Sequence, residues 1–98
     1  MTYTPPGPAD LLQCPCCDFF TLPARGDYDI CPVCFWEDDG IDVDRPDVRS
    51  GPNHMTLRQG RHDFSGLGAC DPDMLPHVLP VERRGEYRHE GRTLAPRR

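Results

Sequence analysis

Lysine is absent from this 98-residue chain, and all 11 Lys-or-Arg positions are arginine. Because lysine codons are rich in A and arginine codons largely in G and C, this bias indicates a GC-rich bacterial genome. The chain also lacks any apolar run near the roughly 20 residues that a membrane helix needs. Its start, MTYTPPGPAD, has neither the basic nor the apolar region of a secretion signal. We therefore expect a cytoplasmic protein that does not bind membranes.

Large apolar side chains are scarce as well. Only 37% of the residues are hydrophobic, while the chain carries 12 prolines and 9 glycines. A chain of this length forms one domain at most and buries a modest core, so it usually needs disulfides, a metal or a partner to stay folded. Structural disulfides are rare in a reducing cytosol, so the six cysteines favour a metal site or reactive thiols.

Composition divides the chain into three stretches. Residues 1–12 are rich in proline and predict an extended segment, and residues 13–80 contain every cysteine and predict one small domain. Residues 81–98 hold six arginines and three glutamates with few apolar side chains, which predicts a charged, flexible tail. The first 80 residues carry 13 acids against five arginines, an excess that does not suit the phosphate backbone of nucleic acids.

Local patterns predict a hairpin. The stretch FFTL at 19–22 and the stretch YDI at 28–30 favour strands, and PARGD between them carries turn residues. We therefore expect a β-hairpin with a cysteine pair at each end. Residues 71–80, which include three prolines, predict an extended strap.

A helix is predicted over residues 56–65. Thr56 followed by Gln59 forms a capping box, and Gly66 or Gly68 ends the helix. Gly60 inside this helix costs about 1 kcal/mol relative to alanine. One aromatic cluster is expected to pack under the helix, formed by Phe19, Phe20, Phe35, Trp36 and Phe64.

The strongest signal is a repeated CxxC pair with thirteen residues between the two copies. Its members are Cys14, Cys17, Cys31 and Cys34. Tetrahedral zinc binds four thiolates at about 2.3 Å, and two CxxC turns facing each other supply them. Pro15 and Pro32 preset the two turns, and Arg25 is a candidate donor to the thiolates. We expect a small metal-stabilised α+β domain: a zinc-ribbon or rubredoxin-like hairpin with two CxxC knuckles, one helix and long irregular loops. The ion would be single and structural, and iron shares the same ligand set.

Two cysteines remain outside this scheme. Adjacent Cys16 and Cys17 point in different directions, and the spacing of Cys14 and Cys17 matches that of the second pair, so Cys16 is expected outside the metal shell. Its entry into the shell is the alternative. Cys70 follows the helix alone and is expected to be a small buried apolar residue, with a reactive thiol as the alternative. Dithiol redox chemistry would need a helix directly after a CxxC pair, which neither DFFTL nor FWEDDG favours.

Six acids crowd residues 37–47. A calcium loop would need a glycine and a final glutamate at set positions, which Asp42, Asp44 and Asp47 do not provide. We expect these carboxylates to cap nearby N–H groups and to pair with arginines, namely Arg49, Arg58 or Arg61. The alternative is an acidic face that binds a basic protein partner.

Three motifs resemble the bacterial cysteine-rich CPCC domain family. They are CPCC at 14–17, YDICPVCFWEDDGID at 28–42 and GPNHMTLRQGRHDFSGLGAC at 51–70, and the resemblance runs from about Gln13 to about Val78. It implies a small zinc-ribbon-like domain and assigns no biochemical role. The family commonly has glycine after the second knuckle cysteine, where this chain has Asp18. That position often needs a positive φ, which aspartate tolerates better than most residues.

Catalysis is not expected, since His54, His62, His77 and His89 have no partner at the spacing of a catalytic triad. A saturated metal site and an acidic body favour a non-catalytic module that binds another protein. One alternative is a nucleic-acid-binding zinc ribbon that uses the arginines of residues 83–98. The other is a thiol-redox or metal-handling protein that uses Cys16 or Cys70.

Overall fold

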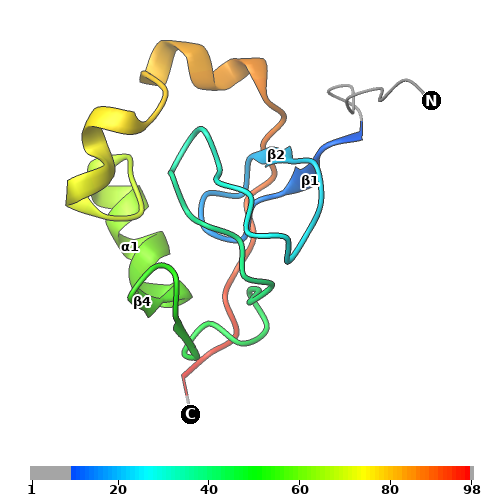
Figure 1. Ribbon diagram of the computed structural model, residues 1–98, viewed down its shortest axis with the longest axis vertical. Helices are drawn as coiled ribbons and strands as arrows, with labels where there is room; N and C mark the ends of the chain where they lie inside the picture. Colours follow the sequence, from blue (N-terminus) through cyan, green and yellow to red (C-terminus); the bar gives the residue numbers. More distant parts are fainter. Residues whose placement is uncertain (1–9, 98) are drawn as a thin grey trace.

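The computed structural model describes residues 10–97, so most of the predicted N-terminal segment, residues 1–9, lies outside the described residues. Two short antiparallel hairpins and one α-helix form a small α+β domain (Figure 1). The elements in chain order are β1 (Leu12–Gln13), β2 (Phe20–Leu22), β3 (Arg49–Ser50), β4 (Met55–Thr56), α1 (Leu57–Leu67) and the 3₁₀ helices η2 (Pro72–His77) and η3 (Val81–Glu86). Within the described residues, none of the helices has the length and hydropathy to cross a bilayer.

The strands pair across the cysteine turns. β1 pairs with β2, with Leu12 opposite Leu22, so the loop of this hairpin is the first CxxC turn. Ile30 likewise bridges Glu37 across the second CxxC turn. The expected pairing of residues 19–22 with 28–30 was therefore wrong. Each CxxC turn reverses the chain within a few residues, so closing its own flanks costs less conformational entropy than closing a longer loop.

Helix α1 forms where the capping signals place it. The Thr56 hydroxyl accepts a hydrogen bond from the backbone N–H of Gln59 at 3.2 Å, and Gly68 ends the helix in the left-handed conformation with φ of 86°. Glycine suits that position because it has no Cβ to clash there. The predicted N-cap and one of the two predicted stops are confirmed.

Sulfur and a single indole dominate the core. Trp36 is fully buried, together with Leu22, Val33 and Leu57, and these side chains surround the cysteines. The expected aromatic cluster forms only in part: Phe19 and Phe64 pack against this core, and all four phenylalanines are only partly buried. A core this small has room for one large aromatic side chain once the cysteine knuckles occupy its centre.

Gly60 marks the closest approach of α1 to the indole. A Cβ at residue 60 would lie 2.7 Å from Cζ3 of Trp36, inside van der Waals contact. We expect Gly60→Ala to destabilise the fold by about 1–2 kcal/mol, because overpacking outweighs the gain of about 1 kcal/mol in helix propensity. The matched control is Gly66→Ala, whose Cβ meets nothing within 4 Å and should stabilise the same helix. Denaturant titration of both variants measures the difference, and equal shifts would contradict the packing argument.

Residues 71–80 form no extended strap. They contain η2, which starts where the Asp71 carboxylate accepts a hydrogen bond from the Asp73 N–H at 2.9 Å and Pro72 occupies the first turn. An acidic N-cap followed by proline favours a helical turn, since proline has no N–H to leave unsatisfied there. The expected strap was wrong for that reason.

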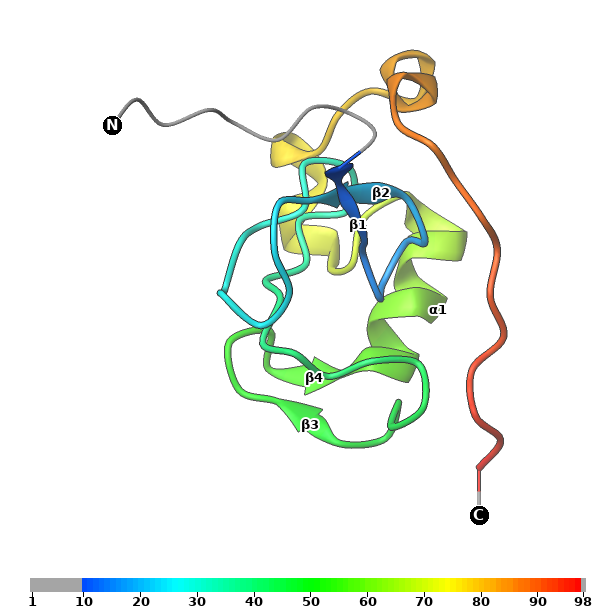
Figure 2. The same cartoon turned by 90° about the vertical axis from the view of Figure 1, so that its right-hand side faces the viewer.

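Residues 81–97 form hydrogen bonds with the rest of the domain, which composition did not predict. The Arg84 guanidinium donates hydrogen bonds to the carbonyl oxygens of Gly68 at 2.8 Å and Leu79 at 2.9 Å. The first of these gives a partner to the carbonyl of the residue that ends α1. The chain then bridges to Phe19 through His89 and reaches Val43 through the Ala95 N–H. Figure 2 shows this segment, in orange and red, running past α1. Composition misses such contacts because they are single long-range hydrogen bonds and ion pairs.

Candidate metal centre

The two CxxC turns are built alike. In each, the N–H of the first cysteine donates to the carbonyl five residues later, Cys14 to Phe19 at 2.8 Å and Cys31 to Trp36 at 3.0 Å. The residue after each second cysteine is left-handed, with φ of 67° at Asp18 and 68° at Phe35. The positive φ expected at Asp18 is confirmed. The positive φ at Phe35 was not predicted, although Phe35 follows the second CxxC pair as Asp18 follows the first. We call these turns the first knuckle (14–18) and the second knuckle (31–35).

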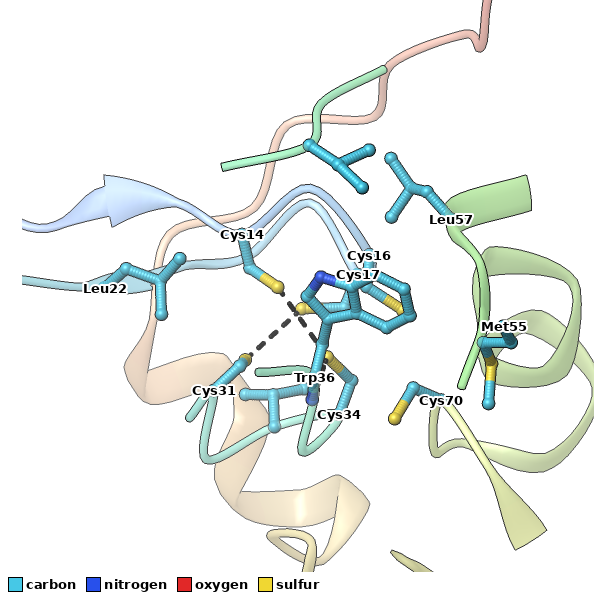
Figure 3. Packing of buried hydrophobic residues seen from close by; sticks show 12 residues of the cluster. Cys14, Cys16, Cys17, Leu22, Cys31, Cys34, Trp36, Met55, Leu57 and Cys70 are labelled. Atoms are coloured by element: carbon cyan, nitrogen blue, oxygen red, sulfur yellow. Dashed lines mark hydrogen bonds between the residues drawn. The ribbon is translucent and has the colours of Figure 1, made fainter. Parts of the chain in front are cut away.

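The four knuckle sulfurs converge on one point. The Sγ atoms of Cys14, Cys17, Cys31 and Cys34 all lie within 4.8 Å of one another. Cys14 and Cys34 are 3.6 Å apart, and Cys17 and Cys31 are 3.7 Å apart (Figure 3). A disulfide would need about 2.05 Å, whereas the edge of a tetrahedron with metal–sulfur bonds of 2.3 Å is about 3.8 Å. All four cysteines are free and between 0% and 4% exposed. The cluster can hold a metal ion, and its donor set fits a tetrahedral thiolate site.

Cys16 and Cys70 stay outside this cluster. The Cys16 sulfur faces α1, 3.4 Å from the position that a Cβ on Gly60 would take. Cys70 contacts the site through its backbone, since its N–H donates to the Cys34 carbonyl at 2.9 Å. Both side chains are 2% exposed, as expected for small buried apolar residues.

Burial opposes charge on the sulfurs. Burial raises the pKa of Cys34 and of Cys17, and hydrogen bonds with neighbouring thiols add to this effect. Burial also works against the Cys31 thiolate, yet hydrogen bonds from the neighbouring thiols and the Thr21 hydroxyl, 3.0 Å away, lower its pKa well below the usual value. Burial therefore disfavours the charged form of Cys17 and Cys34, whereas hydrogen bonds favour the thiolate of Cys31.

Metal uptake should therefore release protons. A dication binds thiolates, so Cys17 and Cys34 must lose their protons when it enters, and the affinity should rise with pH. We expect release of about two protons or more per ion at neutral pH. Stopped-flow mixing with a pH indicator in weak buffer measures the release, and titrations between pH 6 and 8 measure the affinity. An affinity that is independent of pH would contradict this charge distribution.

A buried ion cluster covers the first knuckle. The Asp18 carboxylate, 5% exposed, accepts two hydrogen bonds from the Arg61 guanidinium at 2.7 and 2.9 Å. It accepts two more from Arg92, through Nε at 3.0 Å and the backbone N–H at 2.7 Å. Burial alone would raise the pKa of Asp18, but the two arginines outweigh it and the pKa is lowered. The same guanidinium groups donate to knuckle carbonyls, those of Pro15 and Cys14, so two positive charges lie beside the thiolates.

Sequence reasoning missed this cluster. Arg61 was expected to pair with the 37–47 acids, and Arg92 was placed in the tail, 74 residues from Asp18. Arg25, the expected thiolate donor, instead binds Asp38 and Asp42 with Nε and Nη1 at 2.9 and 2.6 Å. The unusual Asp18 itself was the available signal, since a buried carboxylate needs cationic partners.

The acidic loop folds through its own carboxylates. Asp38 accepts hydrogen bonds from the N–H groups of Gly26 and Gly40, and Asp39 accepts one from Ile41. These contacts confirm the expected capping of local N–H groups. Among the arginines expected to pair here, Arg58 does so, with two hydrogen bonds to Asp47 at 2.8 and 3.0 Å.

Fold and site together define a small α+β domain built around four clustered cysteines. The family model described as cysteine-rich CPCC matches residues 12–85. The chain belongs to this family, which confirms the resemblance seen in its motifs. No curated protein and no solved structure matches it.

Proposed function

We propose that this chain binds one structural zinc ion and acts as a non-catalytic module that binds another protein in the bacterial cytoplasm. The observation that carries the proposal is the closed sulfur cluster, in which four buried cysteines converge within 4.8 Å. Four thiolates complete a tetrahedral shell and leave no position for a substrate or an activated water. Such an ion stabilises the fold, so the remaining surface is free to serve recognition.

The ion is tested by native mass spectrometry of protein purified without added metal. We expect one zinc per chain, bound to the folded monomer or oligomer. Iron in its place would overturn the zinc assignment and keep the tetrathiolate site. A folded chain that carries no metal would overturn the proposal as a whole.

The binding role is tested by cross-linking in the native host, followed by capture of the metal-loaded protein. We expect the same partner in repeated captures with the wild-type chain, and its loss with Cys31→Ser, which should not hold the ion. Cys16→Ala is the control, because its sulfur lies outside the cluster. Recovery of no partner under these conditions would count against a binding module.

The two alternative functions, nucleic-acid binding and thiol chemistry, have less support. A nucleic-acid-binding ribbon would use free arginines near the C-terminus, but Arg84 and Arg92 bind the domain, and Arg83 and Arg88 pair with Glu86 and Glu90. A reactive thiol needs a lowered pKa and solvent access. Burial instead raises the pKa of both Cys16 and Cys70. We therefore favour protein binding.

A further inference from the structure

A small pocket lies against the second knuckle, and we call it the knuckle pocket. Apolar side chains line much of it, among them Ile30, Phe35, Met55 and Met74. Its volume of about 200 Å³ is below the roughly 300–1,000 Å³ of sites for small molecules and cofactors. A space of this size suits one aliphatic side chain. Methionine side chains adapt their shape, which favours a pocket that receives a side chain from a partner.

Acids surround the pocket, and no Lys or Arg is among its lining residues. Glu37, Asp71 and Asp73 contribute three carboxylates, and none of them forms an ion pair within residues 10–97. Asp18 and Asp42, by contrast, are each neutralised by arginine. The carboxylates at this pocket are therefore available to a basic group on a partner.

The pocket walls are held in place before anything binds. The Asn53 side chain accepts from the Glu37 N–H at 2.9 Å and donates to the Glu37 carbonyl at 2.8 Å, which ties the loop before β4 to the knuckle. The Cys70 N–H ties the chain after α1 to Cys34. Preorganised walls reduce the entropy lost on binding. Because Phe35 of the second knuckle is one of the lining residues, the shape of the pocket depends on that knuckle.

Two strained residues line this pocket. Phe35 and His54 have φ of 68° and 59°, in the left-handed region that glycine adopts without cost. Glycine at residue 35 would relieve that strain, yet the chain carries a partly buried phenyl ring there, stacked on His77 with centroids 5.2 Å apart. The left-handed φ at residue 35 belongs to the knuckle turn, as it does at Asp18 in the first knuckle, and it places the phenyl ring at the pocket.

We propose that the knuckle pocket binds a segment of a partner protein that inserts one aliphatic side chain and places a lysine or arginine beside it. The side chain contacts Phe35 and Met74, and the basic group meets the carboxylates of Glu37, Asp71 and Asp73. This proposal rests on the protein-binding function proposed above and names the surface that performs it.

The test selects random 12-residue peptides displayed on phage against the full zinc-loaded chain. We expect enrichment of Leu, Ile, Met or Val next to Lys or Arg. A resynthesised peptide should shift the amide resonances of Phe35, His54 and Met74, and its affinity should fall at least tenfold for the double variant Asp71→Asn with Asp73→Asn. Asparagine at 71 keeps the N-cap of η2.

The matched control is the double variant Asp27→Asn with Asp44→Asn, which removes the same charge from two exposed sites away from the pocket and should keep wild-type affinity. The pocket proposal is overturned if selected peptides bind both double variants equally, or if they shift amide resonances far from the pocket. The protein-binding function would stand in either case. Selection of no peptide also overturns the pocket, and the host cross-linking experiment then decides the function separately.

Discussion

Cys31→Ser is expected to leave the chain without bound metal and without a stable fold. Structural zinc sites contribute on the order of 10 kcal/mol to folding, and a small domain has a net stability of only about 5–15 kcal/mol. The sulfur of Cys31 is one of the four that converge, and hydrogen bonds from its neighbours lower its pKa. The fully buried side chains of the core are mostly cysteines and their neighbours, so little apolar packing remains to replace the ion.

Circular dichroism, amide NMR dispersion and metal content by mass spectrometry measure this effect. Cys16→Ala is the matched control from the same knuckle, and it should keep the ion and lose about 1–2 kcal/mol from packing. A chelator added to the wild-type chain should unfold it, and zinc should restore it. A Cys31→Ser chain that folds like wild type without metal would refute the structural role of the ion.

Asp18→Asn is expected to destabilise the fold by about 3 kcal/mol, because Arg61 loses its counter-ion while Arg92 keeps Asp42 at 3.2 Å. Asparagine has the same shape and tolerates the left-handed φ of this position, so the change isolates the charge. The control is Asp47→Asn, where the carboxylate is half exposed and pairs with Arg58 on the surface. Surface pairs contribute about 0–1 kcal/mol.

The same pair of variants has a defined pH dependence. The folded-state pKa of Asp18 is lowered, so its contribution is complete above the ordinary carboxyl value of 3.8 and is lost as the pH falls through the folded value. The difference between wild type and Asp18→Asn should therefore be constant from pH 6 to pH 8. Denaturant titrations across that range measure it. A difference that shrinks between pH 8 and pH 6 would exclude this carboxylate as its source.

Several features that depend on short-range sequence patterns were predicted correctly. The CxxC spacing identified the four thiols of the cluster because each turn brings its own two cysteines together, and the capping box placed the start of α1 because Thr56 and Gln59 are one helical turn apart. The left-handed Asp18 followed from the same local geometry. The strand pairing did not follow from local geometry. Residues 19–22 and 28–30 can pair equally well with each other or with the residues that flank the knuckles.

The sequence by itself determined the sulfur cluster, the helix and its caps, and the family. Only the tertiary structure decided where the charges go: Arg92 reaches Asp18 across 74 residues, Arg25 turns to Asp38, and three acids remain unpaired around the knuckle pocket. The physical reason is the separation along the sequence over which each feature is determined. Turn and helix preferences depend on neighbours within about four residues, whereas an ion pair needs only that two groups meet in space, which composition and spacing do not encode.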